Sequence, residues 1–394
     1  MHSRVISDQT MNGREMSMLR LQLRLNALIS CALVLLACDS AAFADEPASK
    51  PARLRIGVAG LVHGHVYGFL QAAVYHPDVE IVGLYDARPD LLHRYGRHHH
   101  KLDPAILFSD LEEMLAKARP EAVAVFTDTF DHLQVVEACA RRGVHVMVEK
   151  PFAVSTEHAR AMERAATRAG IHLLVNYETT WYPSARAAWQ IAKQDQRLGR
   201  VHRMILNFGH RGPKEIGMPD EFVAWLTDPD RNGGGALYDF GCYGANLATW
   251  LMDNRRPASV MAVTQRLKSD PTYRRVDDEA TIVLTYPDAQ VVIQASWNWP
   301  FNRKDMEIYG ERGSLMIPDG GSYRLRLDGA GDSQAQAEPV PPPAHDPISY
   351  LVAVVRGRIV PSGPSSLETN VIAAEILDAA RRSAETHQAI KVVE

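Results

Sequence analysis

The sequence predicts an α/β protein with two domains, in which a doubly wound parallel sheet comes first and a mostly antiparallel sheet packed on helices follows. Two patterns support this prediction. After residue 53, short apolar runs alternate with helical stretches, an order that produces right-handed crossovers and a parallel sheet. From about Arg200, longer runs with partial alternation of apolar and polar residues are typical of antiparallel strands with one face on helices.

The first domain is predicted over residues 53–176 of the 394. Its first strand, 54–60, is a short apolar run that stops at a glycine. In such sheets, ligands bind beyond the carboxyl ends of the strands, so we expect a ligand there. The other predicted strands are 79–85, 122–126, 144–148 and 171–175, and the predicted helices include 111–118, 133–142 and 159–169.

The second domain is predicted over residues 177–394. A helix at 236–252 is expected to pack on the sheet, and the segment 329–345, rich in Pro, Ala, Gln and Gly, is expected to be a loop. The predicted strands are 201–208, 260–267, 280–286, 291–297 and 306–309, and the predicted closing helices are 349–357 and 367–386.

The N-terminus has the pattern of a secretory signal over residues 1–44. Arg20 and Arg24 precede an apolar run at 25–38, which is followed by Ala42-Phe43-Ala44. Cleavage after Ala44 would leave 394 − 44 = 350 residues, of which 45–52 form a linker. The alternative is a lipoprotein signal over 1–37, because Leu35-Leu36-Ala37-Cys38 resembles a lipobox whose Cys38 would carry a lipid anchor.

We therefore predict an exported protein, either periplasmic or anchored to the membrane as a lipoprotein, rather than a cytoplasmic one. A buried N-terminal helix is the competing interpretation, but it would leave residues 33–36 apolar on every face. The twin-arginine signal that exports folded, cofactor-loaded proteins is missing, since three residues separate Arg20 from Arg24.

The amino-acid composition limits the classes of partner that the protein is expected to bind. The chain has 43 Lys and Arg against 47 Asp and Glu, a formal net charge of −4, which argues for a small-molecule partner rather than nucleic acid. The body of the chain has no apolar run of the ~18 residues that a membrane span needs. Four scattered cysteines do not suggest a zinc cluster, and His98, His99 and His100 are expected in a solvated loop, so no metal site is predicted.

The turn after the first strand resembles a dinucleotide-binding turn. Its glycines would let backbone amides approach a pyrophosphate, although Val62 and His65 stand where a G-x-G-x-x-G motif has its second and third glycines. A tight turn that binds nothing is the alternative. The candidate cofactor-binding residues here are Gly57, Gly60, Leu61, Val62, His63 and Gly64.

Two charged positions at strand ends extend this interpretation. Asp86 ends the second predicted strand, where a carboxylate can bind the adenosine ribose and favour NAD, while Arg88 leaves NADP open. Asp86 could instead be a solvated cap of the next helix. Lys150 follows a buried strand, where its ammonium can bind a substrate hydroxyl, or Glu149 and Lys150 could be a surface pair.

Three segments now carry a family resemblance. Glu149-Lys150-Pro151, Asn176-Tyr177 and the run GGGALYDFGCY at 233–243 resemble the glucose-fructose oxidoreductase / inositol dehydrogenase (Gfo/Idh/MocA) family from about Arg53 to the C-terminus. The resemblance implies an N-terminal Rossmann domain, a C-terminal domain with a large open sheet, and hydride transfer between NAD(P) and a sugar, cyclitol or related hydroxyl compound. An open sheet of this kind often pairs with a second copy, so a homo-oligomer is expected.

The resemblance also implies roles for single residues. Lys150 matches the lysine that contacts the reacting hydroxyl, Asp239 matches an orienting carboxylate, and Tyr243 stands where many members have an acid/base histidine. A phenol can donate a proton to a carbonyl, or act as a base if Lys150 lowers its pKa. Asn246 stands where an aspartate is often found, and Asp239, Tyr243 and Asn246 would share one face of the helix, unless that face is bonded into the sheet.

The remaining candidates lie near the predicted crevice. The further cofactor-binding candidates are Thr127, His132 and Glu149, and the substrate-binding candidates are Lys150, Tyr177, Trp181, His210, Asp239 and Asn246. Two other functions stay open at this point. One is an NAD-dependent enzyme of the same fold that cleaves glycosidic bonds, and the other is a non-catalytic exported carbohydrate-binding protein.

Overall fold

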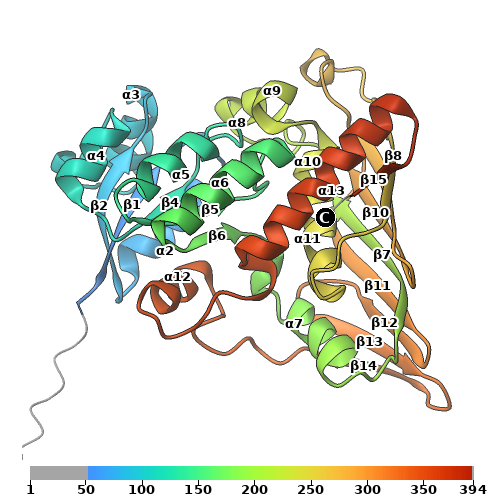
Figure 1. Cartoon of the computed structure of the whole chain (residues 1–394). Coiled ribbons are helices and arrows are strands. Elements are labelled where there is room, and N and C mark those ends of the chain that lie inside the picture. The colour runs from blue at the N-terminus through green and yellow to red at the C-terminus, as the bar shows by residue number, and fades with distance from the viewer. Residues whose placement is uncertain (1–51, 393–394) are drawn as a thin grey trace, which may run out of the picture. The chain divides into compact units, whose positions relative to one another are not determined.

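A computed structural model describes residues 52–392, which contain two β-sheets and their covering helices (Figure 1). The predicted signal at 1–44, its alternative ending before Cys38, and all but the last residue of the linker 45–52 lie outside the described residues. Within the described part, no helix is both long and apolar enough to cross a membrane.

The first sheet is parallel, as predicted, with the strand order β3-β2-β1-β4-β5-β6. The chain runs outward from β1 to β3 and then crosses to β4, so the order reverses between β1 and β4, the switch point where such sheets bind ligands. The strands are β1 (Leu54–Ala59), β2 (Val79–Tyr85), β3 (Leu107–Phe108), β4 (Ala122–Val125), β5 (His145–Glu149) and β6 (Leu173–Asn176).

Side chains of this sheet alternate between two helical layers. In β4, for example, Val123 and Val125 pack with one layer, whereas Ala122 and Ala124 pack with the other. The first layer contains α4 (Leu111–Ala118), α5 (His132–Ala140) and α6 (Thr156–Ala169), and the second contains α2 (Val66–Tyr75), α3 (Pro89–Leu91), the π-helix η1 (Leu92–His99) and α12 (Pro347–Val355). A helix from near the end of the chain, α12, thus completes the core of the first sheet.

The second sheet is mostly antiparallel, as predicted, with the order β14-β13-β12-β11-β7-β10-β9-β8-β15, in which β7 and β10 are parallel. Its strands are β7 (Val201–Gly209), β8 (Ser259–Gln265), β9 (Glu279–Thr285), β10 (Gln290–Ser296), β11 (Arg303–Gly310), β12 (Gly313–Ile317), β13 (Ser322–Leu327), β14 (Asp332–Gln336) and β15 (Ile390–Lys391).

Helices cover one face of the second sheet, and no described element covers the other (Figure 1). Its buried side chains share one apolar cluster with α4, α5 and α6, so the two sheets are joined by a continuous core. The remaining helices are α7 (Pro183–Trp189), α8 (Asp220–Leu226), α9 (Pro229–Asn232), α10 (Ala236–Asp239), α11 (Gly241–Leu251) and α13 (Leu367–Thr386), with short turns η2 (Pro104–Ile106), η3 (Glu178–Trp181), η4 (Gln190–Gln194), η5 (Pro271–Tyr273) and η6 (Gly363–Ser365).

Three local predictions were wrong. The helix predicted at 236–252 is broken at Phe240 into α10 and α11, because Asp277 accepts hydrogen bonds from the amides of Gly235 and Leu237 and fixes the first turn separately. The loop predicted at 329–345 contains β14, a polar edge strand that pairs only with β13 and therefore lacks apolar alternation. His98 and His99 do not lie in a loop but end η1, and His100 follows directly after it.

Candidate active site

A buried ion pair joins the two domains where the first sheet ends. Lys150 follows β5 and Asp239 ends α10, and Lys150 Nζ donates a hydrogen bond to Asp239 Oδ1 at 2.6 Å. The two residues are only 4% and 3% exposed. The Trp297 indole donates to the other carboxylate oxygen at 2.9 Å, so both oxygens of Asp239 have a partner.

The electrostatics of this pair keep both groups charged. Burial alone would raise the pKa of Asp239, but the Lys150 ammonium and the Trp297 indole outweigh it and hold that pKa below its usual range. For Lys150, burial alone would lower the pKa, but the Asp239 carboxylate outweighs it and raises that pKa. At neutral pH the site therefore presents an ammonium with its proton donors oriented by a carboxylate.

Tyr243 lies beside this pair among aromatic rings. The Nζ atoms of Lys150 and Lys304 are 5.3 and 5.1 Å from its ring centroid, and Phe208 stacks on it at 5.6 Å. Its hydroxyl has no hydrogen-bond partner within the described residues. Burial, followed by the charge of Glu178, raises the pKa of Tyr243 well above its ordinary value, so this phenol is neutral at physiological pH.

Two of the predicted substrate-binding residues lie next to Tyr243. The ring centroid of Tyr177, directly after β6, is 5.5 Å from that of Tyr243. His210, directly after β7, packs its ring edge-on against Phe240 at 4.8 Å and accepts a hydrogen bond at Nδ1 from the amide of Gly212. Burial lowers the pKa of His210, so it is neutral at pH 7.

Sequence analysis assigned two neighbours of this group no role beside Lys150 and Asp239. Trp297 binds Asp239 across 58 positions of the chain, and only its place directly after a strand pointed to it. Lys304 lies over the Tyr243 ring and pairs with Glu178, but it belongs to the charged run Arg303-Lys304-Asp305, which is typical of a solvent-exposed strand.

The turn after β1 has a conformation that only glycine tolerates at its first position. Gly60 has φ = +86°, and a Cβ there would lie 2.4 Å from the backbone nitrogen of Thr127. The amide of Leu61 donates to Asp86 Oδ2 at 2.7 Å, and that of His63 donates to the carbonyl of Phe126. The amides of Val62 and Gly64 have no partner among the described residues, and α2 begins at Val66, two positions after Gly64.

Two free amides at a helix N-terminus suit the pyrophosphate of a dinucleotide. Asp86 directly follows β2 and also accepts a hydrogen bond from the amide of Arg88 at 2.8 Å, while burial raises its pKa. The Arg88 guanidinium pairs with Asp90 at 2.7 Å rather than facing the turn. The residues present therefore fit a dinucleotide, and Asp86 stands where a ribose would be bound.

A segment of the second domain packs over this turn. Trp225 in α8 donates its indole N–H to the carbonyl of Val62 at 3.2 Å, and the Phe222 ring lies edge-on to His63. Arg231 in α9 binds Asp128 and Asp131, which follow β4. The connection from β7 to α10 thus closes over the switch point of the first sheet.

The other cofactor candidates lie along the same edge. His132 begins α5 and is 1% exposed, with its Nδ1 against the carbonyl of Phe152 at 3.1 Å and its Nε2 without a partner. Thr127 contacts Gly60 and donates to the carbonyl of Asp128. Glu149, at the end of β5, accepts from the Asn176 side chain at 2.6 Å.

Three candidates lie elsewhere. Gly57 is inside β1, where a Cβ would crowd Met114 and Val123, so it serves the packing of α4 and not the turn. Asn246 was predicted to face the crevice, but it is fully buried and bonds to the carbonyl of Pro364 and to Asn370. Nearly every residue of α11 is buried, so a polar side chain on it must find its hydrogen-bond partners inside the protein, and for Asn246 these come from η6 and α13.

The third candidate is Trp181, which forms no hydrogen bond or ring contact with Lys150, Asp239 or Tyr243 but packs beside Asn176. Its indole donates to Asn176 at 2.9 Å and its ring packs on Tyr350 of α12. It lines a cavity of about 670 Å³ together with His65, Glu149 and Asn176, so it faces the mouth of the turn rather than the ion pair.

Fold and turn define a dinucleotide-binding oxidoreductase with a second sheet domain, and comparison with known proteins agrees. Residues 54–177 match the family model described as an oxidoreductase family with an NAD-binding Rossmann fold, and residues 187–316 match that of the Gfo/Idh/MocA C-terminal domain. The chain belongs to the Gfo/Idh/MocA family, which confirms the resemblance and the predicted fold class.

The curated relatives include scyllo-inositol 2-dehydrogenase (NADP(+)) of Bacillus subtilis, which is 26% identical over 80% of this chain and 92% of its own length. D-apiose dehydrogenase of Paraburkholderia graminis is 27% identical over 67% of each chain. Among solved structures, an inositol dehydrogenase homolog complexed with NAD+ from Azotobacter vinelandii aligns with a TM-score of 0.75 at 18% identity, covering 87% of this chain and 98% of its own. The two curated relatives are similar to this chain in sequence, and the solved structure is similar to it in fold.

His132 makes stability depend on pH. Burial lowers its pKa from 6.5 to about 4, so between these values the unfolded chain binds a proton that the folded chain does not. The free energy of unfolding therefore falls as the pH drops from about 6.5 to 4, with His132 contributing about 3 kcal/mol. In His132→Gln this loss should shrink by that amount in urea titrations across the range. Exposed His98→Gln should leave the slope unchanged, and equal slopes in wild type and His132→Gln would contradict the assignment.

Proposed function

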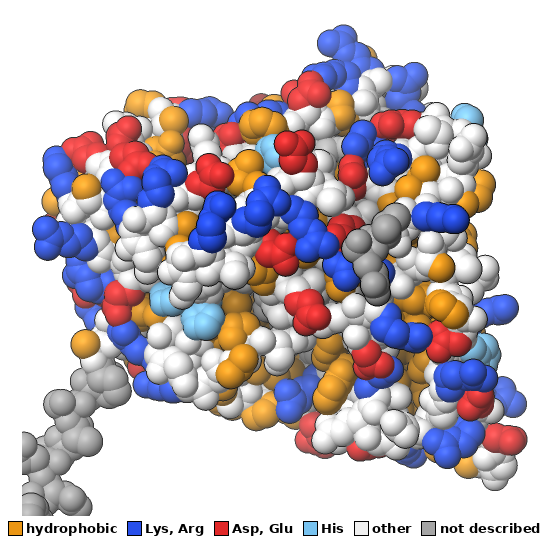
Figure 2. Space-filling view, viewed as in Figure 1, with side chains coloured by type: hydrophobic (Ala, Val, Ile, Leu, Met, Phe, Trp, Pro, Cys, Tyr) orange, Lys and Arg blue, Asp and Glu red, His pale blue; other side chains and the backbone are white. Residues whose placement is uncertain are grey.

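We propose that this chain is an NAD(P)-dependent dehydrogenase or reductase that acts on a hydroxyl-bearing carbon of a sugar, cyclitol or related compound. The observation that supports this most is the Lys150–Asp239 pair at 2.6 Å, buried where the two domains meet and next to the neutral phenol of Tyr243. Relatives named as inositol and apiose dehydrogenases support the substrate class. Charges of both signs are interspersed over the face in Figure 2, so this face has no large patch of one sign.

The cofactor side of the reaction belongs to the turn after β1. The free amides of Val62 and Gly64 would hold the pyrophosphate, and Asp86 would accept hydrogen bonds from the adenosine ribose. A carboxylate there repels an extra phosphate, so NAD is favoured, and NADP remains open because a relative is NADP-dependent. When bound, the nicotinamide supplies or accepts the hydride.

The substrate side belongs to three residues. The Lys150 ammonium would donate a hydrogen bond to the reacting oxygen and stabilise the negative charge that develops on it. Asp239 would orient that ammonium, and Tyr243 would exchange the proton. Because the pKa of Tyr243 is raised rather than lowered, the phenol holds its proton at neutral pH, which favours donation to a carbonyl in the reductive direction.

Neither alternative function gains support from the described residues. A glycoside-cleaving enzyme or a non-catalytic binding protein would have to differ from a dehydrogenase in the residues around Lys150. The contacts of Lys150, Asp239 and Tyr243 show no such difference. The dehydrogenase is therefore the function that these residues support best.

Tyr243→Phe tests the acid/base assignment. Loss of the hydroxyl should lower kcat by about 10²–10⁴-fold with whichever inositol or aldose and dinucleotide the wild type turns over, because proton transfer by a positioned group contributes that much. Tyr286→Phe is the matched control, since Tyr286 is also buried and its hydroxyl has no partner. Unchanged turnover in Tyr243→Phe would rule the assignment out.

The proposal includes export of the chain. It rests on the sequence pattern alone, in which a basic region, an apolar run and Ala42-Phe43-Ala44 precede the folded body. Intact-mass analysis of the protein expressed in a Gram-negative host should give a chain starting at Asp45, or one starting at a lipid-modified Cys38. A chain that keeps residues 1–37 and stays in the cytoplasmic fraction would contradict export.

We also propose that the open face of the second sheet joins two copies of the chain. Met261 and Val263 of β8 are 44% and 58% exposed there, on a face that no described element covers. Exposed apolar side chains on a large sheet are typical of subunit contacts. Sedimentation should show an oligomer, and Met261→Lys with Val263→Lys should dissociate it, whereas a wild-type monomer would contradict the proposal.

A further inference from the structure

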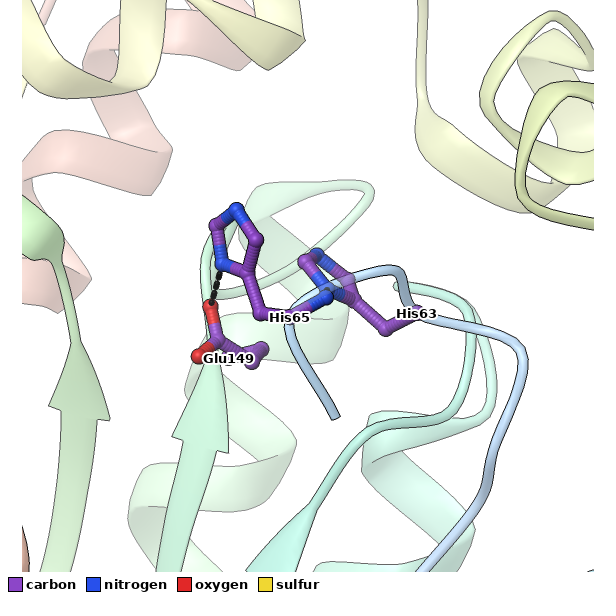
Figure 3. Close-up of side chains that lie close together, drawn as sticks. All are labelled: His63, His65 and Glu149. Atoms are coloured by element: carbon purple, nitrogen blue, oxygen red, sulfur yellow. Dashed lines mark hydrogen bonds and ion pairs between the residues drawn. The ribbon is translucent and has the colours of Figure 1, made fainter. Parts of the chain in front are cut away.

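Two histidines and a carboxylate converge at the mouth of the turn, outside the Lys150–Asp239 group. His63 and His65 come from the turn after β1, and Glu149 comes from the end of β5 (Figure 3). One ligand atom from each lies within 4.8 Å of the other two. Sequence analysis predicted no metal site, and 84 positions separate His65 from Glu149.

His63 is held so that one particular nitrogen is available. Its Nε2 lies 3.3 Å from the carbonyl oxygen of Lys150, and because a carbonyl only accepts, Nε2 carries the proton. The lone pair is then on Nδ1, which has only a long contact of 3.3 Å with the amide of His65. A ring fixed by donation to a backbone carbonyl is the usual arrangement of a metal-binding histidine.

Packing holds this imidazole in place. His63 is 1% exposed, with the Trp225 and Phe222 rings at 5.5 and 5.2 Å. The ring is therefore kept in the orientation in which Nε2 faces the Lys150 carbonyl and Nδ1 faces His65.

Glu149 supplies a buried carboxylate. Its side chain is 2% exposed, and its Oε1 accepts a hydrogen bond from Asn176 at 2.6 Å. Its Oε2 accepts from the amide of Lys150 and faces His65 Nδ1, each at 3.2 Å. The ammonium of Lys150 is bound to Asp239, so the ionisable partner of Glu149 is His65. A cation at Oε2 would be favoured in this buried position.

We propose that His63 Nδ1, His65 Nδ1 and Glu149 Oε2 bind a divalent metal ion of the Zn²⁺ type. Two imidazoles and one carboxylate are a donor set that Zn²⁺ and similar borderline cations prefer over Mg²⁺ or Ca²⁺. Asn176 and the Lys150 carbonyl are the outer-shell groups that orient two of the three ligands.

The remaining coordination position would be open. His65 and Glu149 line the cavity of about 670 Å³ at the mouth of the turn, so water or an oxygen-bearing ligand can reach the ion from there. His65 is 41% exposed at its side chain and can adjust to the metal distance, whereas His63 and Glu149 are fixed. The site needs no dinucleotide and does not rest on the proposed redox function.

Metal titration of the full chain tests this inference. After removal of metals with EDTA, Zn²⁺ is titrated against a chromophoric chelator in the absence of dinucleotide, and one equivalent should bind. His65→Gln and Glu149→Gln should each weaken binding by more than the roughly 10–100-fold expected for the outer-shell variant Asn176→Ala. Co²⁺ in place of Zn²⁺ should give the visible absorption of a four- or five-coordinate site in the wild type and lose it in both ligand variants.

The surface histidines provide the control. His98 and His99 are exposed and could bind Zn²⁺ adventitiously, so His98→Gln with His99→Gln should keep the full affinity. Because His65 is partly exposed, His65→Gln should fold, which circular dichroism checks. Stoichiometric binding that survives in His65→Gln, that disappears with the His98 and His99 changes, or that is absent from the wild type would overturn the proposal.

Discussion

The buried pair between Lys150 and Asp239 is the interaction on which the rest of the structure depends. Each charge is desolvated, so each is tolerable only because the other lies 2.6 Å away. Lys150 is placed by the end of β5, in the first sheet, and Asp239 by the short helix α10, which packs against β9 and β10 of the second sheet. The pair therefore fixes how the two sheets meet, and the same geometry leaves an oriented ammonium beside Tyr243.

A second constraint acts at the switch point of the first sheet. The Trp225 indole donates to the carbonyl of Val62, and Arg231 binds Asp128 and Asp131. The connection from β7 to α10 therefore holds the turn after β1 in place. That turn carries Val62 and His65 where the usual motif has its second and third glycines. The backbone conformation of a dinucleotide site is kept through Gly60, while the side chains of His63 and His65 add ligand chemistry that the motif lacks.

Most of the fold could be predicted because the length and spacing of apolar runs indicate which residues are buried and whether they form a strand or a helix. The helix 111–118 and the strand 79–85 match the observed bounds, and the Lys150 and Asp239 positions come from a family motif. The site residues that were predicted wrongly or not at all have physical causes in common. Asn246 is buried and bonds to Asn370. Gly57 packs against Met114 of α4. Trp297 comes from a part of the chain far from Asp239 in sequence, yet it binds Asp239. Such contacts depend on tertiary packing, which local patterns do not record.

The most direct test of this account is the coupling free energy between Lys150 and Asp239. It is measured from the unfolding free energies of Lys150→Met, Asp239→Asn and the double variant against the wild type. Each single change leaves a buried charge alone and should cost about 3–5 kcal/mol, whereas the double variant should cost clearly less than their sum. Effects that add to within about 0.5 kcal/mol would show that the two groups do not depend on each other and would contradict the account.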